Sequence, residues 1–279
     1  MRTIHSTEVS KAVARLCIDA NYYISDDIER ALKKACAEEA DGRASQVLSR
    51  LLENAEIART EDMAICQDTG MAVVFVEIGQ NVLVEGSLSE AINQGVREGY
   101  DKGFLRKSVV TDPLRRVNTG DNTPAVIHYE VVDGDGLKIT VAPKGFGSEN
   151  MSAIKMLKPL EGEAGVTDFV TETVRNGGGN PCPPIVVGVG IGGTMEKAAL
   201  LAKKALLLSV DNKNSDEYYS DMEQALLDRI NGLGIGPMGW GGKTTALGVN
   251  ILTYPTHIAG LPVAVNISCH VTRHASAVI

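Results

Sequence analysis

The sequence predicts an α/β protein in which mixed sheets are flanked by helices. Apolar residues recur at helical spacing over most of the first sixty residues, as expected of amphipathic helices. Short apolar runs of strand length, at 71–78 and 185–189, lie between clusters of turn-forming residues. From about residue 150 onward, segments with strand and helix patterns alternate, which is typical of layered α/β folds.

Size and composition indicate an ordinary globular protein. Its 279 residues are 44% hydrophobic and include no low-complexity tract, so the chain can bury one large core or two small ones. The N-terminus has no apolar stretch of signal-peptide length, and no segment approaches the roughly 20 apolar residues of a membrane span. We therefore expect a cytoplasmic protein. A formal net charge of -8 and 4% aromatic residues argue against nucleic acid or an anionic membrane as partner.

The first part of the chain is predicted to be mainly helical. Ser6 and Ser25 are good N-cap residues, and apolar positions follow each of them at helical spacing. Cys17 and Cys36 lie on these apolar stripes, so we expect both to be buried packing residues. The elements predicted up to residue 103 are helices at 6–20, 25–38, 44–60 and 87–103, the last capped by Ser87, and a strand at 71–78.

A hairpin is predicted next. Residues 125–132 and 137–142 alternate in polarity around the sequence Asp-Gly-Asp-Gly at 133–136, which is typical of a tight turn between paired strands. The turn-rich segment before it is long for a loop, and we expect it to be ordered. Beyond the hairpin we expect helices at 150–157, 163–176, 194–208 and 215–232, and strands at 185–189, 246–253 and 262–268.

Three of the five cysteines lie in loops at predicted strand ends. Cys182 stands in the sequence Asn-Pro-Cys-Pro-Pro, whose prolines fix φ and stiffen the loop. Cys66 comes just before the strand at 71–78, and Cys269 comes just after the apolar run 261–267. An odd number of cysteines in a cytoplasmic chain favours thiols, a metal or a cluster over disulfides. Because a packing cysteine gains little beside polar turn residues, we expect these three to share one centre.

The spacing of these cysteines argues against a local zinc-type pair. Cys66 and Cys182 are 116 positions apart, and Cys182 and Cys269 are 87 apart, so only the tertiary structure can assemble them. Three unrelated buried cysteines are the alternative. If all three bound a four-iron cluster, one iron would lack a protein ligand and could act as a Lewis acid on a substrate oxygen. Adding or removing water also needs an acid and a base, for which Asp68 is the candidate.

Two glycine-rich motifs resemble nucleotide-binding sequences but match them incompletely. The sequence GVGIGG at 188–193 fits the dinucleotide fingerprint and is followed by Asp211, but no strand is predicted to deliver that acid to a ribose. The sequence GGKT at 241–244 resembles the end of a phosphate loop, but Pro237 stands where its first glycine is required. A glycine-rich turn that lets the backbone approach a ligand or subunit is the simpler interpretation of the second motif.

Six motifs together resemble the class I iron-sulfur fumarate hydratase family. They are ICQDTG at Cys66, LRKSVV at Arg106, DPLRRVNTGDNTPA from Asp112, KGFGSEN from Lys144, NPCPPIVVGVGIGG at Cys182 and NISCH at Cys269. The likeness spans most of the chain and is greatest to the alpha subunit of two-subunit enzymes. The related tartrate dehydratase alpha subunit shares the cysteine motifs, but KGFGSEN and TGDNTPA are more similar to the fumarase branch.

The resemblance implies a cofactor, a reaction and a partner. It implies one catalytic domain over residues 1–279, with a pocket that binds a 4Fe-4S cluster on Cys66, Cys182 and Cys269. The implied reaction is the reversible hydration of fumarate to L-malate. The family's second substrate arginine and its active-site threonine and lysine belong to a C-terminal part that is absent from this sequence. A separate beta subunit is therefore expected to complete the site, in a dimer of alpha–beta pairs or around an alpha homodimer.

The family's site residues carry over position by position. Asp68 is the implied catalytic acid/base, and the implied substrate-binding residues are Gln67, Arg106, Gly145, Gly147 and His257. From the residues alone, Arg106 could equally be a solvated charge, and His257 a core or interface histidine. The roles of His128, His270, His274, Asn118 and Lys243 are left unassigned. Two other functions stay open: an L-tartrate dehydratase alpha subunit, and a non-catalytic nucleotide-binding module that uses GVGIGG.

Overall fold

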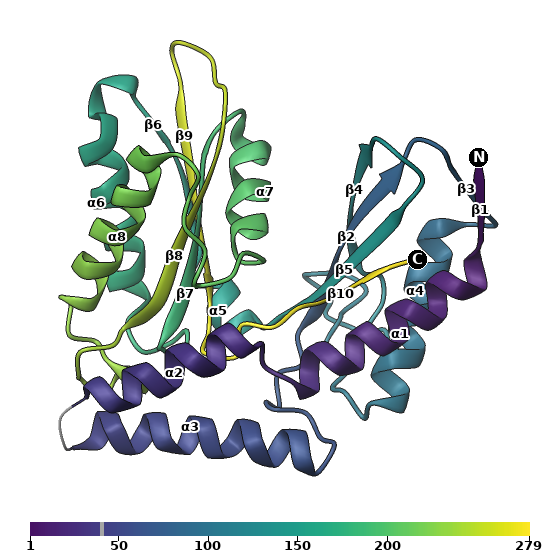
Figure 1. Ribbon diagram of the computed structural model, residues 1–279, viewed down its shortest axis with the longest axis horizontal. Helices are drawn as coiled ribbons and strands as arrows, with labels where there is room; N and C mark the ends of the chain where they lie inside the picture. Colours follow the sequence, from purple (N-terminus) through teal and green to yellow (C-terminus); the bar gives the residue numbers. More distant parts are fainter. Residues whose placement is uncertain (40–41) are drawn as a thin grey trace. The chain divides into compact units, whose positions relative to one another are not determined.

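A computed structural model describes residues 1–39 and 42–279 of the chain (Figure 1). The chain divides into two compact units: unit 1 comprises Met1–Ile24, Asn54–Phe146 and Arg273–Ile279, and unit 2 comprises Ser25–Glu53 and Gly147–Thr272. Each unit contains helices packed on a sheet of mixed strand directions, so the predicted α/β class is confirmed. That the chain forms a single catalytic domain stays a prediction.

Unit 1 is built on a four-stranded sheet with the order β10-β5-β2-β4. Apolar residues of its two long helices share one core with the two central strands, and this core includes Val13, Cys17, Val74, Tyr100 and Ile139. The elements are α1 (Ser6–Tyr22), α4 (Leu88–Lys102), β2 (Met71–Gly79), β4 (Val126–Val132), β5 (Leu137–Lys144) and β10 (Ala275–Val278), with β1 (Arg2–His5) and β3 (Val82–Glu85) forming a separate parallel pair.

The predicted hairpin is wrong, because another strand separates its two arms. Both arms exist, as β4 and β5, but β2 lies between them, parallel to β4 and antiparallel to β5. The apolar run of β2 is buried almost throughout, and a strand buried in this way belongs in the centre of a sheet. The turn at 133–136 crosses the end of β2 instead: the amide of Gly79 donates to Gly136 O at 2.8 Å, and that of Asn81 to Gly134 O at 3.0 Å.

Unit 2 has a four-stranded sheet with the order β6-β9-β7-β8, covered by α7 on one face and by α6 and α8 on the other (Figure 1). The side of β7 that carries Ile185, Val187 and Val189 packs in the same apolar cluster as α6 and α8. The elements are β6 (Ala153–Leu157), α6 (Gly162–Gly177), β7 (Ile185–Gly192), α7 (Met195–Ala205), α8 (Glu217–Asn231), β8 (Ala246–Tyr254) and β9 (Leu261–Ser268), together with α2 (Asp26–Glu38).

One predicted helix of this unit is a strand. The sequence predicts a helix at 150–157, but residues 153–157 form β6 and pair antiparallel with β9. A short apolar run fits both a helix and a strand. Here the segment becomes a strand because it pairs with the edge of β9 that β7 leaves open. The other predicted helices and strands are present, with ends shifted by a few residues. Two further helices, α3 (Arg43–Thr60) and the short α5 (Phe146–Glu149), run across the boundaries of the units in sequence.

The helix caps agree only in part with the prediction. Ser87 caps α4, and its hydroxyl accepts a hydrogen bond from the amide of Glu90 at 3.3 Å. Ser25 occupies the N-cap position of α2 without a capping hydrogen bond, and α1 begins at Ser6 with His5 in the N-cap position. Within residues 1–39 and 42–279, no helix combines the length and apolar character that a membrane crossing requires.

Candidate functional site

The loop that carries Cys66 accepts hydrogen bonds from buried side chains of unit 1. Tyr100, which is fully buried on α4, donates its hydroxyl to Thr69 O at 2.8 Å and to Gly70 O at 3.1 Å. Burial raises the pKa of Tyr100, so its hydroxyl keeps the proton that these bonds need. Asn122 Nδ2 also donates to Gly70 O, at 3.2 Å. The main chain just beyond Cys66 is thus fixed by two elements that are remote in sequence.

The Asp68 carboxylate is held by main-chain amides. Gly70 N donates to Oδ1 at 3.0 Å, and Phe146 N, at the start of α5, donates to Oδ2 at 3.0 Å. The two bonds fix the orientation of the carboxylate while each oxygen keeps capacity for another hydrogen bond. A carboxylate fixed in this way, two residues from a cysteine, is suited to accept or return a proton at a bound substrate.

Two other predicted substrate residues lie against this loop. A Cβ on Gly145 would stand 3.1 Å from Asp68 Oδ2, so only glycine leaves the carboxylate undisturbed. Thr69 Oγ1 donates to Arg106 O at 3.1 Å, which ties the main chain of Arg106 to the Cys66 loop. The Arg106 side chain is exposed and, within the described residues, makes no hydrogen bond or ion pair. Gln67 is exposed on the same loop.

The turn-rich segment at 111–125 is an ordered support for the loop of Arg106. Asn122, which is buried with a φ of 63°, accepts the amides of Ser108 at 2.7 Å and Val109 at 3.2 Å through Oδ1. Asn118 Nδ2 donates to Lys107 O at 2.9 Å. Sequence reasoning did not select Asn122. The local signal that could have found it is its residue type, because asparagine in a turn-rich segment tolerates the left-handed conformation.

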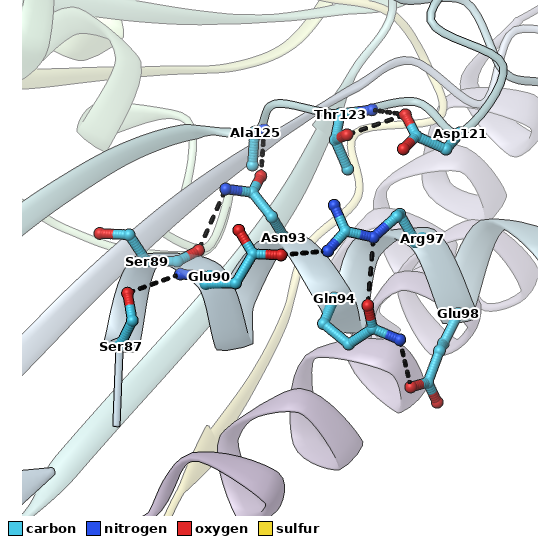
Figure 2. A network of polar contacts seen from close by, with 10 residues as sticks. All are labelled: Ser87, Ser89, Glu90, Asn93, Gln94, Arg97, Glu98, Asp121, Thr123 and Ala125. Atoms are coloured by element: carbon cyan, nitrogen blue, oxygen red, sulfur yellow. Dashed lines mark hydrogen bonds and ion pairs between the residues drawn. The ribbon is translucent and has the colours of Figure 1, made fainter. Parts of the chain in front are cut away.

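Helix α4 anchors the end of this segment through a polar network (Figure 2). Asn93 accepts the Ala125 amide through Oδ1 at 2.9 Å, and Asp121 accepts both the amide and the hydroxyl of Thr123, at 3.0 and 2.8 Å. Burial raises the pKa of Asp121, but these hydrogen bonds outweigh it and leave the pKa below its usual range. The segment that holds the Arg106 loop is therefore fixed in turn to the helix that holds the Cys66 loop.

Arg273 is a second residue that sequence reasoning missed. Its side chain is 7% exposed, Nη2 donates to the carbonyl oxygen of Asp68, and Nε donates to Pro143 O at 3.4 Å. Nothing in the local sequence distinguishes it from a surface arginine. It joins the group because the chain returns to unit 1 after β9.

In unit 2, Cys182 and Cys269 lie in neighbouring loops at the same end of two central strands of the sheet. Cys182 precedes β7 and Cys269 follows β9, and Val186 and Ser268 are register partners of these antiparallel strands. His270 joins the loops, because its amide donates to Cys182 O at 3.3 Å and its Nδ1 lies 3.0 Å from the same oxygen. Cys182 has a φ of 56°, a left-handed conformation that is uncommon outside glycine.

The chemistry of the thiols separates the five cysteines into two groups. Cys66, Cys182 and Cys269 are half-buried loop residues that form no disulfide, a setting that suits iron ligands. Cys17 is a core residue, and burial raises the pKa of its thiol to about 12, which makes it unreactive. Cys36 is half-buried rather than fully buried as expected, and its thiol lies 3.7 Å from Ser45 O.

The complete ligand set stays a prediction. Cys66 belongs to unit 1, whereas Cys182 and Cys269 belong to unit 2. Across the described parts of the chain, no three His, Cys, Asp or Glu side chains are gathered closely enough to hold a single metal ion. The donor types fit an iron-sulfur cluster nonetheless, because the chain presents three accessible thiols at loop positions and keeps the other two cysteines on helices.

The two remaining predicted substrate residues lie apart from this group. His257 is in the exposed turn after β8, and Tyr254, at the end of β8, pairs with Gly192 at the end of β7. It therefore lies at the opposite end of the unit 2 sheet from Cys182 and Cys269. Gly147 is exposed in α5, and a Cβ there would meet only Asn180 O, at 3.7 Å.

Packing accounts for the glycines of the fingerprint-like motif. A Cβ on Gly188 or Gly190 would stand 2.1 Å from a carbonyl oxygen of α7, so these glycines let the helix lie directly on β7. Asp211 forms an ion pair with Arg30 at 2.7 Å and does not follow a strand of the sheet. In the described part of unit 2, Gly188 and Gly190 thus lie within β7 and serve helix packing, and Asp211 serves an ion pair.

The GGKT sequence binds a carboxylate of its own chain. Glu39 Oε1 accepts the amides of Lys243 at 2.6 Å and Thr244 at 2.9 Å, and the Lys243 ammonium donates to Glu38 O at 3.1 Å. The positions that a phosphate would need are thus taken by a buried glutamate. This agrees with the interpretation of the segment as a structural glycine turn.

Comparison with known proteins places this geometry in context. A family model described as Fumarate hydratase (Fumerase) matches residues 10–278. A protein of Methanocaldococcus jannaschii that bears the provisional name L(+)-tartrate dehydratase subunit alpha is 42% identical over 275 residues, which are 96% of this chain and 96% of that protein. The L(+)-tartrate dehydratase subunit alpha of Escherichia coli O157:H7 is 32% identical over 276 residues, 98% of this chain and 91% of its own.

Proposed function

Because the chain belongs to the iron-sulfur fumarate hydratase family, and is thus a hydro-lyase, we propose that it is the alpha subunit of an enzyme that hydrates fumarate reversibly to L-malate. One observation carries the proposal. The Asp68 carboxylate is held by two main-chain amides in the loop of Cys66, with Gly145 leaving it clear on one side. Hydration needs such a group to exchange a proton with the carbon next to a carboxylate.

The cofactor in this proposal is a 4Fe-4S cluster held by Cys66, Cys182 and Cys269. When bound, the cluster supplies a Lewis acid for the hydroxyl that is added or removed. The loop positions of these three half-buried cysteines support the assignment, because Cys17 and Cys36 lie on helices. His270, which joins the loops of Cys182 and Cys269, would keep these two ligands in register.

The protein's own groups bind the substrate and move the proton. We assign acid/base catalysis to Asp68 and carboxylate binding to Arg106, whose side chain is exposed and makes no ion pair with the described residues. Gln67 and the main-chain amides of Gly145 and Gly147 would add hydrogen bonds to the substrate. The resemblance also implies that His257 binds substrate. Because His257 lies at the opposite end of the unit 2 sheet from Cys182, that contact would have to form away from the Cys182 loop.

A beta subunit is part of the proposal. The relatives in the comparison are named as alpha subunits, which implies a second chain in their enzymes. We propose that a beta chain binds this one and adds the remaining substrate-binding and proton-transfer groups, in a dimer of alpha–beta pairs.

L-tartrate dehydration is the second candidate, and the names of the relatives favour it. Tartrate and malate differ by one hydroxyl, and the same proton and hydroxyl transfers apply to both. The alpha chain, co-produced with its beta partner and reconstituted anaerobically, decides between them through kcat/KM on L-malate and L-tartrate. A ratio above about tenfold in either direction assigns the substrate. Absence of both activities, with about four irons bound per chain, contradicts the proposal.

A further inference from the structure

Arg273 is a buried cation that forms no ion pair within the described part of the chain. Its two hydrogen bonds go to main-chain carbonyl oxygens, of Asp68 through Nη2 and of Pro143 through Nε. Nη1 is buried and has no hydrogen-bond partner. Within residues 1–39 and 42–279, no carboxylate forms an ion pair with this guanidinium.

A guanidinium in this state calls for an anion. Arginine stays protonated at any ordinary pH, so it cannot relieve its burial by losing the proton. An isolated buried charge is costly, and a buried N–H group without a partner adds the cost of its own lost hydration. Carbonyl oxygens offset part of this cost but bring no negative charge. A ligand carboxylate would supply both the missing charge and the missing acceptor.

The guanidinium of Arg273 lies close to the proposed acid/base. Gly145 lies between the two charged groups: a Cβ built on it would stand 3.1 Å from Asp68 Oδ2 and 3.8 Å from Arg273 Nη2. The guanidinium and the proposed acid/base therefore border the same glycine, on a main chain that both of them fix. A substrate whose carbon exchanges a proton with Asp68 would carry its carboxylate within a few ångströms of this place, because the carboxylate is attached to that carbon.

We propose that Arg273 is a substrate-binding residue, whose Nη1 donates to one carboxylate of the dicarboxylate substrate while Nη2 and Nε hold the Asp68 loop. This inference rests on the proposed hydro-lyase function. It differs from the role of Arg106, whose guanidinium is exposed. Arg273 is already fixed by two carbonyl groups, so little side-chain entropy is lost when the ligand binds.

Binding of dicarboxylates that cannot react tests this role without activity. The cluster-loaded alpha–beta complex is titrated with succinate and with propionate by anaerobic calorimetry, as wild type and as Arg273→Gln, with bound iron measured for each. We expect Arg273→Gln to weaken succinate about 10- to 100-fold, the effect of a charge-assisted hydrogen bond. Propionate has one carboxylate, which the exposed Arg106 can bind instead, so its affinity should fall by under about threefold, and iron content should not change.

Other results overturn the proposal. Succinate affinity that stays unchanged in Arg273→Gln overturns it, as does an equal loss for both acids, which indicates a purely structural role. A wild-type complex that does not bind succinate overturns it as well. Arg229→Gln is the matched control, since Arg229 is exposed and pairs with Asp168 at 2.6 Å; it should leave both affinities unchanged.

A second variant covers the case in which Arg273→Gln does not fold. Arg273→Lys keeps the charge but cannot serve two carbonyl groups and a ligand with one ammonium. It should weaken succinate about 3- to 10-fold, and wild-type affinity would contradict the inference. Failure of the proposed function is separate, because it is read from turnover of L-malate and L-tartrate by the wild-type complex.

Discussion

The two cysteine loops described in full are held in different ways. The loop of Cys66 is fixed by side chains from other elements, since Tyr100, Asn122 and Arg273 all donate to its carbonyl oxygens. The loop of Cys182 is stiffened by its own prolines and bound through its main chain, since His270 N donates to Cys182 O at 3.3 Å and Met238 N donates to Pro183 O at 2.7 Å. Buried side chains of other elements therefore hold the first loop, whereas the second relies on its prolines, on His270 and on main-chain hydrogen bonds.

The difference follows from what each loop carries. The sequence around Cys182 contains no acid or base, so the loop has only a sulfur atom to orient. The loop of Cys66 also carries Gln67 and Asp68, and a carboxylate that exchanges protons must be fixed in direction as well as in place. Prolines and main-chain hydrogen bonds suffice for a ligand, whereas a catalytic side chain also needs buried side chains from other elements to hold its loop.

The largest effect is expected from removal of a sulfur. Cys182→Ser should lose most of the bound iron, the visible absorbance and most of the turnover, because the proposed cluster would then have two protein ligands instead of three. Iron per chain and absorbance after anaerobic reconstitution measure it. Cys36→Ser, which changes a helical thiol beside Ser45, is the control and should keep its iron. Full iron in Cys182→Ser would contradict the ligand assignment.

Asp68→Asn tests whether the Cys66 loop has a catalytic role in addition to its proposed role in binding iron. The amide can still accept a bond from Gly70 or Phe146 but cannot take up a proton at neutral pH, so turnover should fall about 10²- to 10⁴-fold while the iron content stays the same. Steady-state rates of the reconstituted complex, with iron measured on the same sample, give the result. Wild-type turnover in this variant would falsify the acid/base role.

The support of the Cys66 loop can be removed without substituting a residue of the loop itself. Asn122→Ala leaves the Ser108 and Val109 amides and Gly70 O without their buried partner, so the free energy of unfolding should fall by about 2–4 kcal/mol. Urea denaturation measures the loss. Asn118→Ala, an exposed residue of the same segment, should cost under about 1 kcal/mol. Equal losses for the two variants would show that Asn122 has no special share in the support.

The smallest effect concerns the space beside the carboxylate. Gly145→Ala places a Cβ 3.1 Å from Asp68 Oδ2, so we expect turnover to fall about tenfold as the carboxylate shifts. Gly136→Ala is the control, because a Cβ there meets nothing nearer than Val278, at 3.9 Å. If both variants turn over at the wild-type rate, the position of Asp68 tolerates more movement than this geometry implies.

The sequence by itself indicated most helices, the α/β class, the three loop cysteines and Asp68. These features are local. Helical periodicity is read within one segment, and a cysteine among prolines is conspicuous without knowledge of its neighbours. The motifs likewise identified the family that comparison confirms.

The tertiary structure decided what depends on partners that are distant in sequence. β2 separates β4 from β5, and the segment at 153–157 is a strand, because the pairing of a strand depends on which edges and faces other segments leave open. Gly188 and Gly190 serve helix packing, and Arg273 reaches Asp68 from 205 positions away. No local pattern contains such contacts, since hydrogen bonds and packing act between groups that are close in space, whatever their separation along the chain.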